Sequence, residues 1–281
     1  MKLVRYTANG ITRLGKVVGT NVVDLSAIAP HGSMRQLLND LPDIRGSIEA
    51  ADEPALPLES VILEAPITDP QKFLAIGMNY QAHAQEAIAA GIPVPTSQLW
   101  FNKQVSCITG PASPIVYPAV SNALDYEAEL AVVIGKRCRN VLPEDARSVI
   151  AGYTVANDVS ARDWQHRTPT FTLGKSFDTH GPIGPWIITD DEILDPHALT
   201  LRLTVNGEER QSTLTGDMIY NIYDQIAYLS QVMTLEPGDI LSTGTPSGVG
   251  AATNGLLKVG DVVRVEVSDV GVIENTIVSD G

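Results

Sequence analysis

Short stretches rich in apolar residues recur along the chain and are bounded by glycine and proline at the turns. The clearest of them lie at 128–134, 150–156, 185–189, 200–205, 239–243 and 262–267. Near the start, residues 1–26 alternate between apolar and polar side chains around Asn9-Gly10 and Gly19-Thr20-Asn21. Two-residue alternation and short apolar runs indicate β-strands. The pattern therefore predicts a chain made mainly of strands.

Three other stretches have the three-to-four-residue apolar spacing of amphipathic helices. Residues 34–49 follow Ser33, a good N-cap residue, and the other two stretches are 80–90 and 219–233. These helices do not alternate regularly with strands, which disfavours a doubly wound α/β sheet. The expected fold class is mainly β with some α, in which a few helices cover mostly antiparallel sheet.

A proline-containing segment divides the chain unequally. Residues 51–59 (ADEPALPLE) are expected to form a linker, because their prolines block regular structure. A small N-terminal α+β domain is therefore predicted at 1–65 and a larger domain at 66–281.

The charge balance limits the possible partners. The chain has 19 basic and 33 acidic residues, a formal net charge of −14. Such a surface repels phosphate backbones and anionic lipid, so neither nucleic acid nor a membrane is an expected partner. No apolar run approaches the roughly 20 residues that span a bilayer, and the first residues lack the apolar stretch of a signal peptide. With only Cys107 and Cys138, a cytoplasmic protein with reduced thiols is expected.

Three acidic residues are candidates for a metal site. Glu127 and Glu129 point to the same face if they lie on a strand, and Asp158 follows the next apolar strand. Three carboxylates without nearby cysteine or histidine favour a hard cation, Mg²⁺ first and then Mn²⁺ or Ca²⁺. Taken alone, two alternating glutamates more often form a solvated acidic face.

A second group of polar residues can supply catalysis. His83 and Glu86 lie three apart on the predicted helix 80–90, where a carboxylate can orient the imidazole as a general base. Alone, such a pair is more often a surface contact. Lys175 follows a turn-like stretch, where it is either a solvated cation or a group that binds an enolate oxygen.

The stretch 242–250 (STGTPSGVG) is rich in glycine. Ala251 and Ala252 stand where a phosphate-binding loop needs lysine and a hydroxyl residue, so that function is disfavoured. A turn whose N–H groups and threonine hydroxyls bind a carboxylate is the alternative.

Five segments in one order resemble the fumarylacetoacetate hydrolase family, from about Lys72 to the end of the chain. They are GMNYQAH, DYEAEL, NDVSARDWQ, GKSFDTHGPIGPW and GDILSTGTPSGVG. The resemblance implies a β-roll catalytic domain behind a small N-terminal domain, and a homodimer. It also implies a Mg²⁺ or Mn²⁺ site at Glu127, Glu129 and Asp158.

The resemblance extends to single residues. It implies that His83 is the base, with Glu86 as its partner, and that a further set contacts substrate: Arg162, Gln165, Lys175 and Thr245. Ile76 stands where the fumarylacetoacetate-cleaving members carry a fourth carboxylate ligand. The chain is therefore similar to the shorter bacterial and mitochondrial members, which include acylpyruvate hydrolases, decarboxylases and tautomerases.

The leading hypothesis is hydrolytic C–C cleavage of a small 2,4-dioxo acid, giving pyruvate or a substituted pyruvate and a carboxylic acid. His83, Glu86 and Lys175 would be the catalytic residues. The alternative is a decarboxylase or tautomerase/isomerase that uses the same metal site on an oxaloacetate-like or hydroxy-dienoate substrate. A non-catalytic dimeric binding protein is the remote alternative. Residues 80–97 are expected to form a lid over the substrate.

Overall fold

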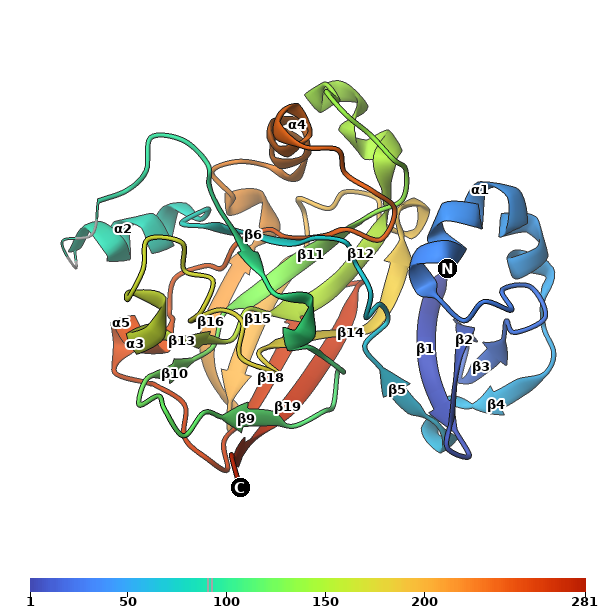
Figure 1. The fold of residues 1–281 in the computed structure, drawn as a ribbon, viewed down its shortest axis with the longest axis horizontal. Coiled ribbons are helices and arrows are strands. Elements are labelled where there is room, and N and C mark those ends of the chain that lie inside the picture. Colours follow the sequence, from blue (N-terminus) through green and yellow to red (C-terminus); the bar gives the residue numbers. More distant parts are fainter. Residues whose placement is uncertain (90, 92) are drawn as a thin grey trace.

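The computed structural model of the chain describes residues 1–89, 91 and 93–281 (Figure 1). Its centre is an antiparallel pair, β11 (Ala128–Ile134) and β12 (Ile150–Asn157), in which Ala128 lies opposite Asn157. Every residue of both strands is buried. Strands covered on both faces need no polar face, which explains why both sequences are nearly continuous apolar runs.

The larger sheet extends on both sides of this pair. Its neighbours beside β12 and β11 are β14 (Gly181–Thr189), β17 (Ile240–Ser242), β6 (Phe73–Gly77) and β7 (Leu99–Lys103). Only the β17–β6 pair among them is parallel. A second sheet contains, in order, β16 (Glu208–Leu214), β15 (Thr200–Val205), β18 (Val262–Val267), β19 (Gly271–Ser279) and β9 (Ile115–Tyr117).

The two sheets pack face to face and share one core. Leu130 and Val132 of β11 lie in this core with Leu203 of β15 and Val265 of β18. In β15 and β18 buried and exposed residues alternate, so the outer face of the second sheet meets water. The helix α4 (Ile222–Val232) adds Ile222 and further apolar residues to the same core.

The N-terminal strands continue the larger sheet at one end. β1 (Lys2–Ala8) pairs with β14, with Leu3 opposite Ile187, and β2 (Ile11–Val18), β3 (Asn21–Asp24) and β4 (Ala55–Pro57) follow in order. The helix α1 (Met34–Ala50) begins at Ser33, whose hydroxyl accepts the Gln36 N–H at 3.2 Å. Its buried leucines share a core with the face of β11 turned away from the second sheet. The boundary at residue 65 stays a prediction.

Most predicted elements are present. The strands at 128–134, 200–205 and 262–267 have the predicted bounds, and the fold class, mainly β with some α, is confirmed. The prediction of an irregular linker at 51–59 was wrong, because β4 pairs there with β3. β4 is the last strand of the sheet, and an edge strand tolerates prolines because one side needs no hydrogen bonds.

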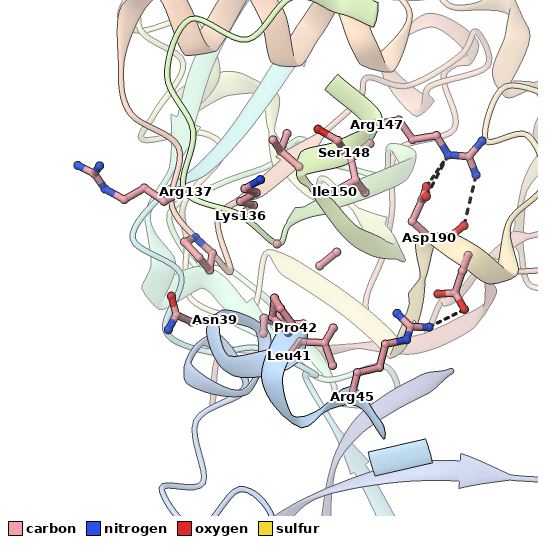
Figure 2. A pocket seen from close by; sticks show the side chains of 16 residues that line it. Asn39, Leu41, Pro42, Arg45, Lys136, Arg137, Arg147, Ser148, Ile150 and Asp190 are labelled. Carbon is pink, nitrogen blue, oxygen red and sulfur yellow. Dashed lines mark hydrogen bonds and ion pairs between the residues drawn. The ribbon is translucent and has the colours of Figure 1, made fainter. Parts of the chain in front are cut away.

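The remaining elements are short. They are α2 (Gln81–Ala89), β5 (Ile62–Glu64), β8 (Ile108–Thr109), β10 (Leu124–Asp125), β13 (Ser160–Ala161), α3 (Arg162–Gln165) and α5 (Gly250–Thr253). Among the described residues, no helix is both long and apolar enough to cross a membrane. A cavity of about 700 Å³ lies between α1 and the larger sheet, and none of the candidate site residues lines it (Figure 2).

Candidate active site

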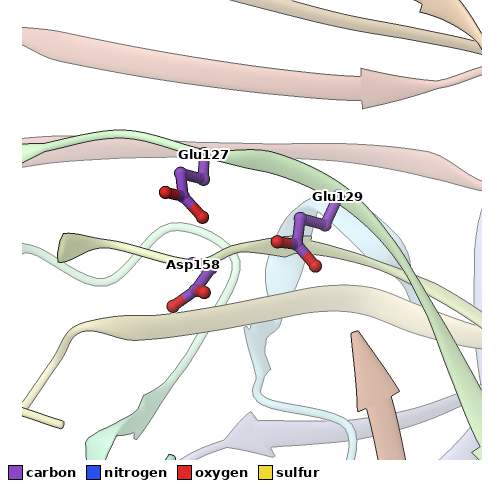
Figure 3. A group of neighbouring side chains, drawn as sticks. All are labelled: Glu127, Glu129 and Asp158. Atoms are coloured by element: carbon purple, nitrogen blue, oxygen red, sulfur yellow. The ribbon is translucent and has the colours of Figure 1, made fainter. Parts of the chain in front are cut away.

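The three predicted metal ligands converge. Glu127 directly precedes β11, Glu129 lies in it, and Asp158 directly follows β12, so the pairing of these strands brings the acids together. Figure 3 shows the three carboxyl groups around one space, and each offers an oxygen within 4.8 Å of the others. The backbone fixes this arrangement, since the Asp158 N–H donates to the Glu127 carbonyl at 2.9 Å.

These acids are buried and held by cations. Glu127, Glu129 and Asp158 are 6%, 1% and 1% exposed. Lys175 Nζ lies 2.8 Å from Glu127 Oε2 and 2.7 Å from Asp158 Oδ2. Arg162 Nη1 lies 2.6 Å from Glu127 Oε1. Burial therefore excludes the reading of these glutamates as a solvated acidic strand face.

The surroundings shift the pKa values of the two glutamates in opposite directions. Burial raises the pKa of Glu127, but Lys175 and Arg162 beside it outweigh burial and lower that pKa to about 2. Burial raises the pKa of Glu129 well above its ordinary value, and the charges of Asp158 and Glu127 raise it further. The cluster therefore lacks positive charge on the side of Glu129.

The donor set fits a hard divalent cation. All three side chains offer oxygen, and a cation among them would relieve the repulsion at Glu129. The Gly244 N–H donates to Glu129 Oε2 at 3.0 Å and keeps that side chain in place. The cluster could therefore hold Mg²⁺, Mn²⁺ or Ca²⁺.

A cavity of about 470 Å³ opens beside this cluster. The predicted site residues that line it are His83, Glu127, Arg162, Gln165, Lys175 and Thr245. Ile76, Leu99, Phe101 and Phe171 form its apolar wall. A small pocket with one apolar wall and a few convergent polar groups suits a small organic acid.

His83 and Glu86 form the predicted pair on α2. His83 Nδ1 lies 3.1 Å from Glu86 Oε2, and the Gly248 N–H donates to Glu86 Oε1 at 3.0 Å. Glu86 thus connects α2 to the glycine-rich loop. Because an ionised Glu86 accepts a hydrogen bond from Nδ1, it leaves Nε2 of His83 as the proton acceptor. The predicted lid, residues 80–97, includes residues 90 and 92, which lie outside the residues that the structure describes.

The glycine-rich loop binds carboxylates, but those of the protein itself. Its N–H groups at Gly244 and Gly248 bind Glu129 and Glu86, and the Gly250 N–H donates to Asp125 at 2.7 Å. Gly248 has φ +99°, and a Cβ there would lie 2.1 Å from a backbone oxygen. The loop N–H groups thus bind carboxylates, as the sequence predicted, and these carboxylates belong to residues of the site.

Arg162 and Thr245 are held in place but keep free donors. Arg162 Nε lies 2.8 Å from Asp125 Oδ2, whereas the buried Nη2 has no hydrogen-bond partner among the described residues. Arg162 Nη1 also donates to Gln165 at 2.9 Å. Thr245 Oγ1 accepts from Gln211 at 2.9 Å and donates no hydrogen bond to any residue that the structure describes. Both residues line the cavity, where a substrate would meet them.

Sequence reasoning missed two residues of the site. Lys103, fully buried in β7, donates from Nζ to Asp158 Oδ1 at 2.6 Å and to the Lys175 carbonyl. The sequence contained a signal for Lys103, because Leu99, Phe101 and Lys103 share one face of the strand. A lysine in such an apolar row needs a buried anion as its partner. His166 lines the cavity next to Phe171. Burial, together with Arg162 and Lys175, lowers the pKa of His166 and keeps it neutral at pH 7.

We predict that Lys103→Met destabilises the metal-free protein by about 3 kcal/mol, because Asp158 loses one of its two buried cationic partners and the buried acids are left with more unbalanced negative charge. Added Mg²⁺ should restore part of this loss, since it neutralises the same carboxylate. Urea unfolding with and without Mg²⁺ measures both effects. Lys258→Met, at an exposed lysine, is the matched control. Equal stability of the two variants would contradict the importance of this pair.

Most of the chain matches one known protein family. The family described as "Fumarylacetoacetate (FAA) hydrolase C-terminal" matches residues 72–278. The chain belongs to the fumarylacetoacetate hydrolase family. The resemblance seen in the sequence motifs is thereby confirmed.

Two similar relatives of this chain carry the name of a tautomerase. The chain is 43% identical to "Oxaloacetate tautomerase fahd2, mitochondrial" of Xenopus laevis, covering 99% of this chain and 90% of the relative. It is 41% identical to "Oxaloacetate tautomerase FAHD2A, mitochondrial" of Homo sapiens, with coverage of 99% and 92%. Tautomerases therefore stand among its similar relatives.

Solved structures support the same fold. Maleylpyruvate hydrolase from Sphingobium sp. SYK-6, in complex with manganese(II) and pyruvate, is 36% identical with a TM-score of 0.86, covering 100% of both chains. The 2-hydroxyhepta-2,4-diene-1,7-dioate isomerase from Mycobacterium marinum is 33% identical with a TM-score of 0.81, covering 100% of this chain and 99% of the other. The fold is shared by hydrolases and isomerases, so the reaction must be argued separately.

Proposed function

We propose that this chain catalyses the metal-dependent keto–enol tautomerisation of a small 2-oxo acid of the oxaloacetate class. The observation that carries the proposal is a fixed proton-transfer pair, His83 with Glu86, in which His83 lines the same cavity as Glu127 of the buried acids. Relatives of 41% and 43% identity named oxaloacetate tautomerases favour this reaction over hydrolysis. Hydrolytic C–C cleavage, the leading hypothesis from the sequence, is therefore ranked below tautomerisation, which was part of its alternative.

Tautomerisation moves one proton between C3 and the oxygen at C2, and it needs no water as nucleophile. His83 takes the proton from C3 of the ketone, and the electron pair of that C–H bond becomes the C2–C3 double bond. The C2 oxygen gains negative charge and takes a proton from water, and the His83 imidazolium releases its proton to water, so the net change is one proton moved from C3 to oxygen. In the reverse direction His83 returns a proton to C3. Glu86 accepts the Nδ1 hydrogen bond and stabilises the imidazolium.

The charges around the cavity suit an acidic substrate. The free Nη2 of Arg162 can donate to a substrate carboxylate. Lys175 borders Glu127 and Asp158, so its ammonium can donate to the C2 oxygen where negative charge develops. When bound at the three acids, Mg²⁺ or Mn²⁺ supplies a Lewis acid that stabilises negative charge on oxygen. Gln165 and Thr245 would orient the substrate.

Hydrolysis of a 2,4-dioxo acid is the second candidate. The structural relative from Sphingobium sp. SYK-6 is a maleylpyruvate hydrolase described with manganese(II) and pyruvate. In this reaction His83 would take a proton from water, and the resulting hydroxide would attack the distal carbonyl. The same residues serve both candidates, so the substrate and products must decide between them.

A product assay separates the candidates. Mg²⁺-loaded protein is mixed with the enol form of oxaloacetate, and the loss of enol absorbance is followed against a Mg²⁺-containing buffer. Parallel reactions measure carbon dioxide from oxaloacetate and acetate from acetylpyruvate. We expect accelerated enol loss without carbon dioxide or acetate. Acetate release with no acceleration of enol loss would favour hydrolysis, and carbon dioxide release would favour decarboxylation.

Further properties stay proposals. Mg²⁺ as the physiological cation, a homodimeric state and a cytoplasmic location are predictions from the sequence and the family resemblance. Several relatives carry "mitochondrial" in their names, which concerns those proteins.

A further inference from the structure

A second cavity of the described chain lies away from the acids. It has about 700 Å³ and lies between α1, the loop 135–137 after β11, residues 147–151 at the start of β12, and the segment 190–191 (Figure 2). We name it the α1 cleft. Ligand sites are often found where two parts of a chain meet, with volumes of roughly 300–1,000 Å³.

The α1 cleft has an apolar floor. Figure 2 shows Leu41 and Pro42 of α1 on one side and Ile150 of β12 on the other. Val149 and Ala151 extend the apolar surface on the side of the sheet. Water in contact with this floor is displaced favourably by an apolar group, at roughly 25 cal/mol per Å² covered.

The rim of the cleft is cationic. Arg45 and Arg147 are each held by a carboxylate, Arg45 by Asp191 at 2.6 Å and Arg147 by Asp190 at 2.9 Å. Within the described part of the chain, the Lys136 ammonium has no hydrogen-bond or ion-pair partner.

Arg137, beside Lys136, is 71% exposed, and among the described residues its guanidinium pairs only through Nε, with Glu236. In a chain of net charge −14, free positive charge above an apolar floor is distinctive.

The α1 cleft is separate from the acids, although the same strands reach both. β11 runs from Glu129 to the loop that carries Lys136, and β12 runs from Ile150 to Asp158. The two ends of β11, Ala128 and Ile134, lie six residue steps apart, which corresponds to about 20 Å. A small molecule in the cleft therefore cannot contact the acids or the active-site cavity.

We propose that the α1 cleft binds a small organic anion with an apolar body. The acidic group lies near Lys136, and the apolar body covers Leu41, Pro42 and Ile150. The volume exceeds what an inorganic anion fills, and such an ion would leave the apolar floor wet. An aryl sulfonate or a medium-chain carboxylate has the matching chemistry.

The test uses 8-anilinonaphthalene-1-sulfonate, an aromatic anion that fluoresces in apolar sites. Mg²⁺-loaded full-length protein is titrated in the presence of saturating oxalate, which covers the active-site cavity, and decanoate is then added as competitor. We expect saturable binding that decanoate displaces and oxalate does not. Lys136→Glu should weaken it at least about tenfold, because a charge-assisted contact becomes repulsive.

Two further variants complete the test. Lys258→Glu makes the same charge change on an exposed lysine outside the cleft and should bind like wild type. Ser148→Trp, at an exposed position that lines the cleft, should block binding sterically. Absence of saturable binding, displacement by oxalate, or equal affinity in wild type, Lys136→Glu and Ser148→Trp would overturn the proposal. A change of oligomeric state in Lys136→Glu without loss of dye affinity would overturn it too, in favour of a contact between copies.

Discussion

Asp158→Asn is expected to abolish tautomerase activity and to weaken Mg²⁺ binding by more than about 100-fold. Changes in residues that merely hold metal ligands already cost about 10–100-fold, and Asp158 is a candidate ligand itself. Glu127→Gln and Glu129→Gln should have the same effect. Calorimetric titration with Mg²⁺ measures the affinity, and circular dichroism shows that each variant is folded.

A matched acid nearby provides the control. Asp178 is an exposed carboxylate three residues after Lys175, and Asp178→Asn removes the same charge outside the cluster. It should bind Mg²⁺ with nearly wild-type affinity. Wild-type affinity in all three cluster variants would show that the metal site has been assigned wrongly.

His83→Ala is expected to lower kcat by roughly 10²–10⁴-fold, the usual contribution of a positioned acid or base. Mg²⁺ affinity should change little, because the three carboxylates supply the oxygen ligands. Glu86→Gln should lower kcat less, since it keeps a partner for Nδ1 but loses the charge that stabilises the imidazolium. Initial rates of enol loss, measured at saturating Mg²⁺, give these values.

His31→Ala, at an exposed histidine remote from the cavity, should leave kcat unchanged. If His83→Ala instead removes Mg²⁺ binding, His83 is a ligand and not the base. If its kcat equals that of wild type, proton transfer must come from another group, and His166 on the cavity wall is the next candidate.

The strands of the core could be predicted because each carries its own pattern. β11 and β12 are short apolar runs; the two-residue period places Glu127 and Glu129 on one face of the first, and Asp158 directly follows the second. Their convergence needed one further assumption, that the two strands pair, and the register of Ala128 with Asn157 fulfils it.

What could not be predicted depends on contacts between distant segments. Lys103 reaches Asp158 across 55 residues, and the Gly248 N–H reaches Glu86 across 162. Nothing in the sequence next to any of these residues indicates which distant residue it contacts. The strand β4 was missed because proline disfavours regular structure locally, whereas the free edge of a sheet permits it. The α1 cleft arises only when α1 packs on the sheet.

Crystals grown with Mn²⁺ and oxalate test the central claim most directly, through the anomalous scattering of manganese. The account predicts one strong peak between Glu127, Glu129 and Asp158, with oxalate in the neighbouring cavity within reach of Arg162 and Lys175. A peak elsewhere, or none at the three acids while Lys175 still joins Glu127 to Asp158, would contradict it.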